Sequence, residues 1–200
     1  MRRSILFVIF LLGISPQLFA QRYYEGEVPR YEVGAQFDIH YLNGIQEWGG
    51  GVGLRFHYNF DAHFALDSEL VYRQHNVDSL SGVTTPSAVV GQTTGLFGVR
   101  AGKRVEDYGF FASARAGFLH FGTDKGVTLL TRNAVPAFDL RGTLERYHGP
   151  VILRLELGEM IVAYGNAQAA SNVSLGPPPS PGPLGARASP VVGLGFAVRF

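Results

Sequence analysis

The 200-residue chain has no cysteine, and this absence removes several kinds of chemistry at once. Disulfide bonds, thiolate metal sites, a cysteine nucleophile and a lipidated cysteine are all excluded. Lysine is nearly absent too, because Lys103 and Lys125 are the only lysines among 17 basic residues. Soluble domains usually spread lysines over a wet surface, so the shortage is unusual for a soluble protein.

Charge is sparse as well, since Asp, Glu, Lys and Arg make up 16% of the chain and the formal net charge is +1. So small a net charge argues against a nucleic-acid partner. In contrast, the chain is 46% hydrophobic, with 26 glycines, 15 phenylalanines and 9 tyrosines. No apolar run is long enough for a transmembrane helix. Any membrane residence must therefore come from strands.

The N-terminus has the features of a secretory signal. Arg2 and Arg3 precede a short apolar run, and Ala20 offers a small residue before Gln21. This order predicts a signal peptide over residues 1–20, cleaved after Ala20. The alternative is an uncleaved anchor, which the shortness of the run disfavours. Residues 21–30 are polar and contain Pro29, which predicts a periplasmic lead-in to a single domain over residues 31–200.

From Tyr31 onward apolar and polar residues alternate, as in strands that have one apolar face. The pattern recurs in eight segments, near 31–41, 51–60, 64–73, 93–102, 110–118, 138–145, 151–158 and 190–200. At Gly158-Glu159 the phase is lost, which predicts either a β-bulge or a position for Glu159 at the membrane interface.

Short and long connections alternate along the chain. Tight turns are expected at Asp61-Ala62, Lys103–Asp107 and His148–Pro150. An Asn43-Gly44 hairpin and longer loops are expected between the other strands, at His75–Gln92, Gly122–Asn133 and Asn166–Ser189. The last of these contains Pro177-Pro178-Pro179 and cannot pair in a sheet. An even strand number with short turns at one end is typical of outer-membrane barrels.

A soluble barrel or sandwich would turn the apolar face inward, and a membrane barrel would turn it outward. The polar face decides between them, because it holds balanced charges and its cations are all arginine. Its acidic residues are Glu32, Asp38, Asp67, Glu69, Asp139, Glu145 and Glu156, and its arginines are Arg55, Arg73, Arg100, Arg115, Arg141, Arg154 and Arg199. A confined interior requires balanced, hydrogen-bonded charges, which the planar guanidinium suits. We therefore expect these residues to form a structural charge network that plugs the narrow lumen of an eight-stranded barrel.

Aromatic residues gather near the strand ends, as in the two girdles of a membrane barrel. Those next to the short turns are Phe60, Phe64, Tyr108, Phe110, Tyr147 and Phe200. Those next to the longer loops are Tyr41, Trp48, Tyr72, Phe118 and Phe121.

The chain ends on a strand with an aromatic last residue and apolar residues at alternate positions before it. The residues that carry this pattern are Val192, Leu194, Phe196, Val198 and Phe200. The pattern resembles the C-terminal assembly signal of bacterial outer-membrane barrels. With eight strands before it, the chain resembles small OmpA-like or OmpX-like proteins. The resemblance implies the bacterial outer membrane, contact with its lipid, insertion by the barrel assembly machinery, and roles in envelope integrity, adhesion or host interaction.

No catalytic, metal or cofactor site is expected. His40 and Asn43 flank Leu42, where a serine nucleophile of a lipid A deacylase would stand. His40 and His57 are expected to be interior hydrogen-bonding groups, and the other histidines are too scattered for a metal site. The predicted function is a non-enzymatic barrel that displays its loops. The alternatives are a narrow channel or an outer-leaflet lipid-modifying enzyme.

Overall fold

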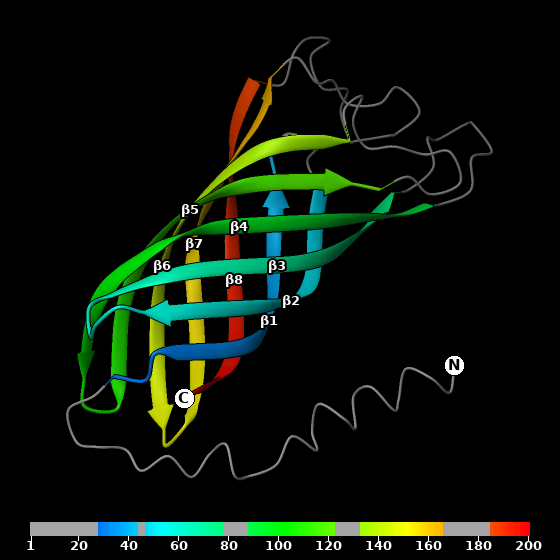
Figure 1. Ribbon diagram of the computed structural model, residues 1–200. Helices are drawn as coiled ribbons and strands as arrows, with labels where there is room; N and C mark the ends of the chain where they lie inside the picture. Colours follow the sequence, from blue (N-terminus) through cyan, green and yellow to red (C-terminus); the bar gives the residue numbers. More distant parts are fainter. Residues whose placement is uncertain (1–27, 44–46, 78–87, 123–132, 166–184) are drawn as a thin grey trace, which may run out of the picture.

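The computed structural model describes residues 28–43, 47–77, 88–122, 133–165 and 185–200, and these form a closed, all-antiparallel barrel of eight strands (Figure 1). The strands are β1 (Tyr31–Leu42), β2 (Glu47–Asn59), β3 (Phe64–Val77), β4 (Ala88–Val105), β5 (Tyr108–Phe121), β6 (Ala134–His148), β7 (Val151–Gly165) and β8 (Gly185–Arg199). This confirms the predicted fold class. A search of these residues for a helix able to span a bilayer finds none. The predicted signal peptide and most of the lead-in lie outside the described residues.

Each strand pairs with its neighbours in sequence, and β1 pairs with β8 to close the barrel. The closing ladder runs from Glu32 opposite Arg199 to His40 opposite Val191. It is extended by Tyr31 and Phe200, which exchange backbone hydrogen bonds of 3.0 and 2.9 Å. Closure matters because hydrocarbon offers no partner to a free backbone N–H or C=O group. We call the end with these two residues and the short turns the turn end, and the opposite end the loop end.

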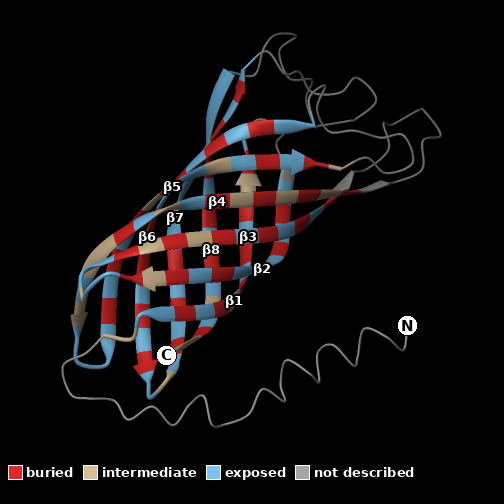
Figure 2. Ribbon diagram, in the orientation of Figure 1, coloured by how far each residue is buried: buried red, intermediate tan, exposed pale blue. Residues whose placement is uncertain are grey.

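Side chains alternate between the interior and the outer surface along the strands (Figure 2), except over the first four residues of β8, which are all exposed. In β6 the alternation is unbroken from end to end. Most of the outward side chains are apolar: Val52, Leu54 and Leu194, for example, are 64%, 65% and 58% exposed. An outer surface of this kind requires lipid around it, so the chain forms a transmembrane barrel of the outer-membrane type. The predicted location in the bacterial outer membrane follows from that surface.

The strands extend further toward the loop end than the sequence predicts. The expected loop residues His75 and Gln92 are buried strand residues of β3 and β4, and Ser189 is a buried residue of β8. The polar composition that predicted loops here belongs instead to inward-facing positions. The β4–β5 connection is also tighter than expected, since β4 continues to Val105 and β5 begins at Tyr108.

The β-bulge predicted at Gly158-Glu159 is wrong. Pairing is regular there, with Glu159 opposite Leu140 on β6 and Pro190 on β8. The register shifts between Ala163 and Gly165 instead, nearer the loop end of β7. Glu159 lies exposed on the outer surface. The backbone therefore keeps its regular alternation, and a charged residue occupies one outward position.

The predicted aromatic girdles hold for most of their members but not for two. Phe60 and Phe110 at the turn end are 60% and 57% exposed, and Trp48 near the loop end is 64% exposed. Tyr147 and Phe121, however, are 6% and 2% exposed and lie inside the barrel. Both are odd-numbered residues on strands whose odd positions face inward, so strict alternation overrides their aromatic character.

Asp61 shapes the β2–β3 turn. Its Oδ1 accepts hydrogen bonds from the backbone N–H groups of His63 (2.6 Å) and Phe64 (2.8 Å). These two donors hold the pKa of the Asp61 carboxyl below its usual value, because they stabilise the ionised form.

Replacing Asp61 with alanine should therefore lower stability in a pH-dependent way. The carboxylate contributes above its unfolded pKa of about 3.9, and its contribution is lost as pH falls through the lower folded pKa. Urea unfolding of wild-type and Asp61→Ala protein in detergent micelles should differ at pH 7 and converge in strong acid. A difference that stays constant with pH would contradict this role.

The outward orientation of the apolar face can be tested at Leu54, which lies midway along β2 and is 65% exposed. A Leu54→Arg substitution should cost about 2–4 kcal/mol of folding free energy in lipid vesicles, because the guanidinium would face hydrocarbon near the midplane. Phe60→Arg, at the turn end, is the matched control and should cost only about 0–1 kcal/mol. Equal, small costs at both positions would mean that water surrounds the barrel.

Candidate functional site

The candidate site is the barrel interior, which holds a network of buried ion pairs. Seven carboxylates and seven guanidinium groups take part within the described chain. They are Glu32, Asp38, Asp67, Glu69, Asp139, Glu145 and Glu156 with Arg55, Arg73, Arg100, Arg104, Arg115, Arg141 and Arg154. The two signs balance, which is the condition for placing so many charges away from water.

Near the turn end the network centres on Glu32. Its Oε1 accepts from Arg100 and Arg104, each at 3.1 Å, and its Oε2 contacts Arg154. The amide of Asn59 also donates to Oε1, at 2.9 Å. One carboxylate from β1 thus joins arginines of β4 and β7 across the lumen, and these contacts link strands that do not pair.

Glu145 on β6 is the second acceptor of this layer. Arg100 and Arg154 donate to its Oε1 at 2.5 and 2.6 Å, and the hydroxyl of Tyr147 donates to its Oε2 at 2.6 Å. The inward position of Tyr147 is thereby explained, because its hydroxyl completes the coordination of a buried carboxylate. Arg100 and Arg154 each bridge Glu32 and Glu145, so the layer acts as one unit.

The middle layer is built around Arg115 on β5. This residue donates to Asp139 at 3.0 and 2.6 Å and to Glu69 at 2.5 Å. Arg141 donates to the same two carboxylates, at 2.7 Å to Asp139 and 3.2 Å to Glu69, and to Glu156 at 3.1 Å. Arg55 completes the layer. Its Nε donates to Asp67 at 2.8 Å, and its Nη1 contacts Glu156.

His57 joins the two layers. Its Nδ1 lies 2.8 Å from Glu32 Oε2, and its Nε2 lies 3.1 Å from Asp67 Oδ1. The hydrogen bonds therefore run without a break from the turn end to the middle of the lumen. The prediction that His57 is an interior hydrogen-bonding group agrees with this position. His40 is interior as predicted, but neither of its ring nitrogens has a hydrogen-bond partner in the described chain.

Closer to the loop end the interior holds a single ion pair among the described residues. Arg73 on β3 forms a bidentate ion pair with Asp38 on β1, in which the Nε–Oδ1 distance is 2.8 Å. Its Nη1 also donates a hydrogen bond to Thr94 Oγ1 at 2.6 Å. Gly51 on β2 makes room for this arm, since a Cβ there would lie 2.4 Å from Arg73 Cγ.

Beyond this pair, and past the buried polar side chains of His40, His75, Gln92 and Ser189, the interior becomes apolar. The buried apolar side chains at the loop end include Leu42, Val90, Leu119, Phe121, Val135, Met160, Val162 and Tyr164. The sequence analysis did not separate these residues from loops or from the outer face. Their inward position could have been found only by continuing the alternation of each strand beyond its expected end.

The structure places thirteen of the fourteen arginine and acidic residues proposed for the lumen inside the ion-pair network described above, and the exception is Arg199. Arg199 lies at the turn end, where its Nε and Nη2 donate to the carbonyl oxygen of Gly149 at 3.1 and 2.9 Å. Its guanidinium carbon lies 4.6 Å from the centre of the Tyr147 ring. Arg104, which the sequence assigned to a turn, takes part in the network instead. Its partners are Glu32, Tyr147 and Asn59.

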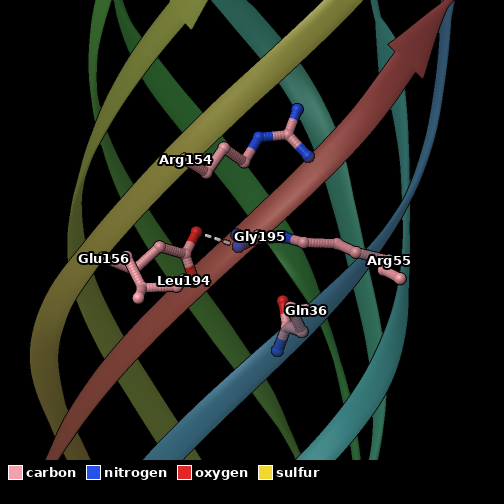
Figure 3. Close-up of a pocket in the computed structure, with 7 residues that line it drawn as sticks. Gln36, Arg55, Arg154, Glu156, Leu194 and Gly195 are labelled. Atoms are coloured by element: carbon pink, nitrogen blue, oxygen red, sulfur yellow. Dashed lines mark hydrogen bonds and ion pairs between the residues drawn. The ribbon is translucent and has the colours of Figure 1, made fainter.

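A small cavity lies in the lumen where β8 passes β1 (Figure 3). The polar side chains of Gln36, Arg55, Arg154 and Glu156 line it, with Gly195 and two outward residues at the wall. Its volume of about 10 Å³ is close to the space that one water molecule needs. Gln36 Nε2 is buried and lacks a protein partner in the described chain, which suits a bound water.

Glu32, His57 and Glu145 bring three metal-type ligand atoms within 4.8 Å of one another. The guanidinium groups of Arg100 and Arg154 already bind both of these carboxylates. A divalent cation would have to displace two buried arginines, so the arrangement favours a salt-bridge cluster.

Comparison with known proteins supports the fold. No family model and no curated protein matches the chain. Among solved structures, Neisserial surface protein A (NspA) aligns with 85% of this chain and 96% of its own, at 11% identity and a TM-score of 0.55. Ail, the attachment invasion locus protein of Yersinia pestis, aligns with 88% of this chain and 100% of its own, at 12% identity and a TM-score of 0.45. The NspA alignment agrees with the small-barrel fold that the sequence resemblance implies.

The Arg73–Asp38 pair offers a test of how the buried charges are held. An Arg73→Met substitution should destabilise the barrel by about 3–5 kcal/mol, because it leaves the Asp38 carboxylate buried without its counter-ion. The double substitution Arg73→Met/Asp38→Asn should recover most of that loss. Urea unfolding in lipid vesicles measures these two variants and the single Asp38→Asn variant, which completes the cycle. Additive effects of the two single substitutions would show that the pair is not coupled.

Proposed function

We propose that the protein is a non-enzymatic outer-membrane barrel whose lumen is plugged by its own side chains and whose loop end carries its interactions. The observation that carries this proposal is the balanced network of seven carboxylates and seven guanidinium groups inside the barrel. Guanidinium groups bridging carboxylates of non-adjacent strands cross the lumen and occupy the path that an ion would take.

The apolar layer at the loop end supports the same proposal. Leu42, Leu119 and Met160 come from three different strands and are completely buried. A hydrated ion that passed the charged layers would next meet side chains that offer it no hydrogen bonds, and dehydrating it there is costly. The alternative of a narrow channel needs both the charged layers and this apolar layer to rearrange.

The serine contacts support a non-enzymatic role. Ser68 and Ser113 donate to the backbone carbonyls of Phe56 and Arg141, and Ser189 accepts from the backbone N–H of Asn43. In these contacts the hydroxyl binds backbone and not a histidine, whereas nucleophilic catalysis needs a base within hydrogen-bond reach. Envelope integrity and surface interaction remain the roles we propose for the loop end.

The outward residues of β8 fit the proposed contact with lipid and with the barrel assembly machinery. Leu194, Phe196 and Phe200 are 58%, 56% and 47% exposed. They form a continuous apolar stripe on the strand that closes the barrel against β1, and such a stripe is open to a partner before closure.

Planar-bilayer recording tests the plugged lumen. Purified, folded protein should insert without stable conductance steps, because its own side chains cross the lumen. A general porin added to the same bilayer serves as the positive control. Large, stable steps from this protein would establish the channel instead.

The enzyme alternative has its own test. Overexpression in a Gram-negative host should leave the mass spectrum of lipid A unchanged. A new deacylated or acylated lipid A species would overturn the non-enzymatic proposal.

A further inference from the structure

Two histidines lie side by side inside the barrel, on the loop-end side of the Arg73–Asp38 pair. His40 on β1 and His75 on β3 are both 0% exposed, and their ring centres are 5.6 Å apart. They are 35 positions apart in sequence and lie on strands that do not pair with each other. The barrel alone brings them together, with β2 between them.

Gly49 on β2 is what allows the two rings to meet. A Cβ at this position would lie 2.4 Å from His75 Cε1, 2.9 Å from His75 Nε2 and 3.0 Å from His40 Nε2. Any side chain there would therefore displace both rings. Both imidazoles converge on the space that this glycine leaves free.

Gln92 holds the His75 ring in place. Arg73 donates to Thr94 Oγ1 at 2.6 Å, and the amide nitrogen of Gln92 donates to the same oxygen at 3.3 Å. The amide oxygen of Gln92 lies 2.7 Å from His75 Nε2. In the tautomer that carries its proton on Nε2, His75 donates to this oxygen and Nδ1 presents a lone pair.

Three ring nitrogens of this pair have no partner in the part of the chain that the structure describes. They are Nδ1 and Nε2 of His40 and Nδ1 of His75. Buried polar atoms are nearly always hydrogen-bonded, and each exception needs an explanation. Here the unpartnered atoms belong to two adjacent neutral imidazoles, each with a lone pair available.

We propose that His40 and His75 form a binding site for a divalent transition-metal cation that prefers imidazole ligands, such as Zn²⁺, Ni²⁺ or Cu²⁺. Neutral imidazole is the commonest protein ligand for these ions. Gln92 supplies the outer contact that metal-binding histidines usually have, an acceptor for the N–H of the other ring nitrogen. The proposal does not depend on whether the lumen conducts.

The chemistry of the pair selects among cations. Mg²⁺ and Ca²⁺ prefer oxygen ligands, and Asp38, two residues before His40 on β1, is already held by two guanidinium nitrogens of Arg73. The two histidines therefore supply the protein's nitrogen ligands, and water can complete the coordination shell. We expect binding by two protein ligands, weaker than at a closed four-ligand structural site.

Refolding the protein into detergent micelles in the presence of graded amounts of Cu²⁺ tests the site, because side chains fill the lumen on both sides of the pair in the folded protein. Wild-type protein should bind one equivalent of Cu²⁺, with electron paramagnetic resonance showing coupling to two nitrogen nuclei, and Mg²⁺ should not compete. His40→Gln and His75→Gln should each weaken binding by at least about 100-fold, and Gln92→Ala by about 10–100-fold. Gly49→Ala should also weaken it, because its methyl group enters the space between the rings.

His63→Gln and His120→Gln are the matched controls, since both histidines are exposed. These variants should bind copper like the wild type. The proposal is overturned if wild-type protein shows no saturable copper binding, which would mean that the two histidines bind water and no metal ion. It is also overturned if binding survives in His40→Gln and His75→Gln but falls in a control. Should either lumen variant fail to fold, the wild-type stoichiometry and the two-nitrogen signal still decide.

Discussion

The structure depends on one electrostatic constraint: charges enclosed in a barrel that lipid surrounds must neutralise one another. Water cannot screen Arg115, Arg141 or Glu69 from outside, because the surrounding wall is apolar and faces hydrocarbon. Five of the seven guanidinium groups therefore contact more than one carboxylate, as Arg141 does with Asp139, Glu69 and Glu156. A buried charge without a counter-ion costs several kcal/mol, so these residues are linked across the barrel and none can be changed alone without cost.

The same constraint explains why much of the fold could be predicted from the sequence. Alternation assigns each residue of a strand to the lumen or to lipid, and arginine without lysine on one face indicates a confined interior. The positions of Arg55, Arg73, Arg100 and Arg154 followed from this alternation, as did the eight strands. Connection lengths then distinguished the two ends of the barrel.

What could not be predicted lies where alternation and composition disagree. Tyr147 and Phe121 were assigned to the girdles because they are aromatic. They occupy odd-numbered positions, however, and these face the lumen on β5 and β6. Arg104 was assigned to a turn because charged neighbours surround it, but it reaches back to Glu32. The pairing of one arginine with several carboxylates depends on register across four or more strands, and a single sequence holds no information on that register.

The interior also changes character along its axis, which the composition of one face does not disclose. Charged layers at the turn end and the middle give way to one ion pair, then to the His40–His75 pair, and then to apolar side chains. The histidine pair thus lies at the boundary between the charged network and the apolar layer. At that boundary a neutral, polar group is least costly to bury, which is consistent with imidazoles there.

Heat-modifiability in SDS electrophoresis tests the central claim, a closed membrane barrel, most directly. Outer-membrane fractions containing the protein are run without heating and after boiling. A closed barrel whose backbone is fully paired stays folded in cold SDS, so the account predicts two different mobilities and recovery with the outer membrane. Identical mobilities, with the protein in the soluble periplasmic fraction, would contradict it.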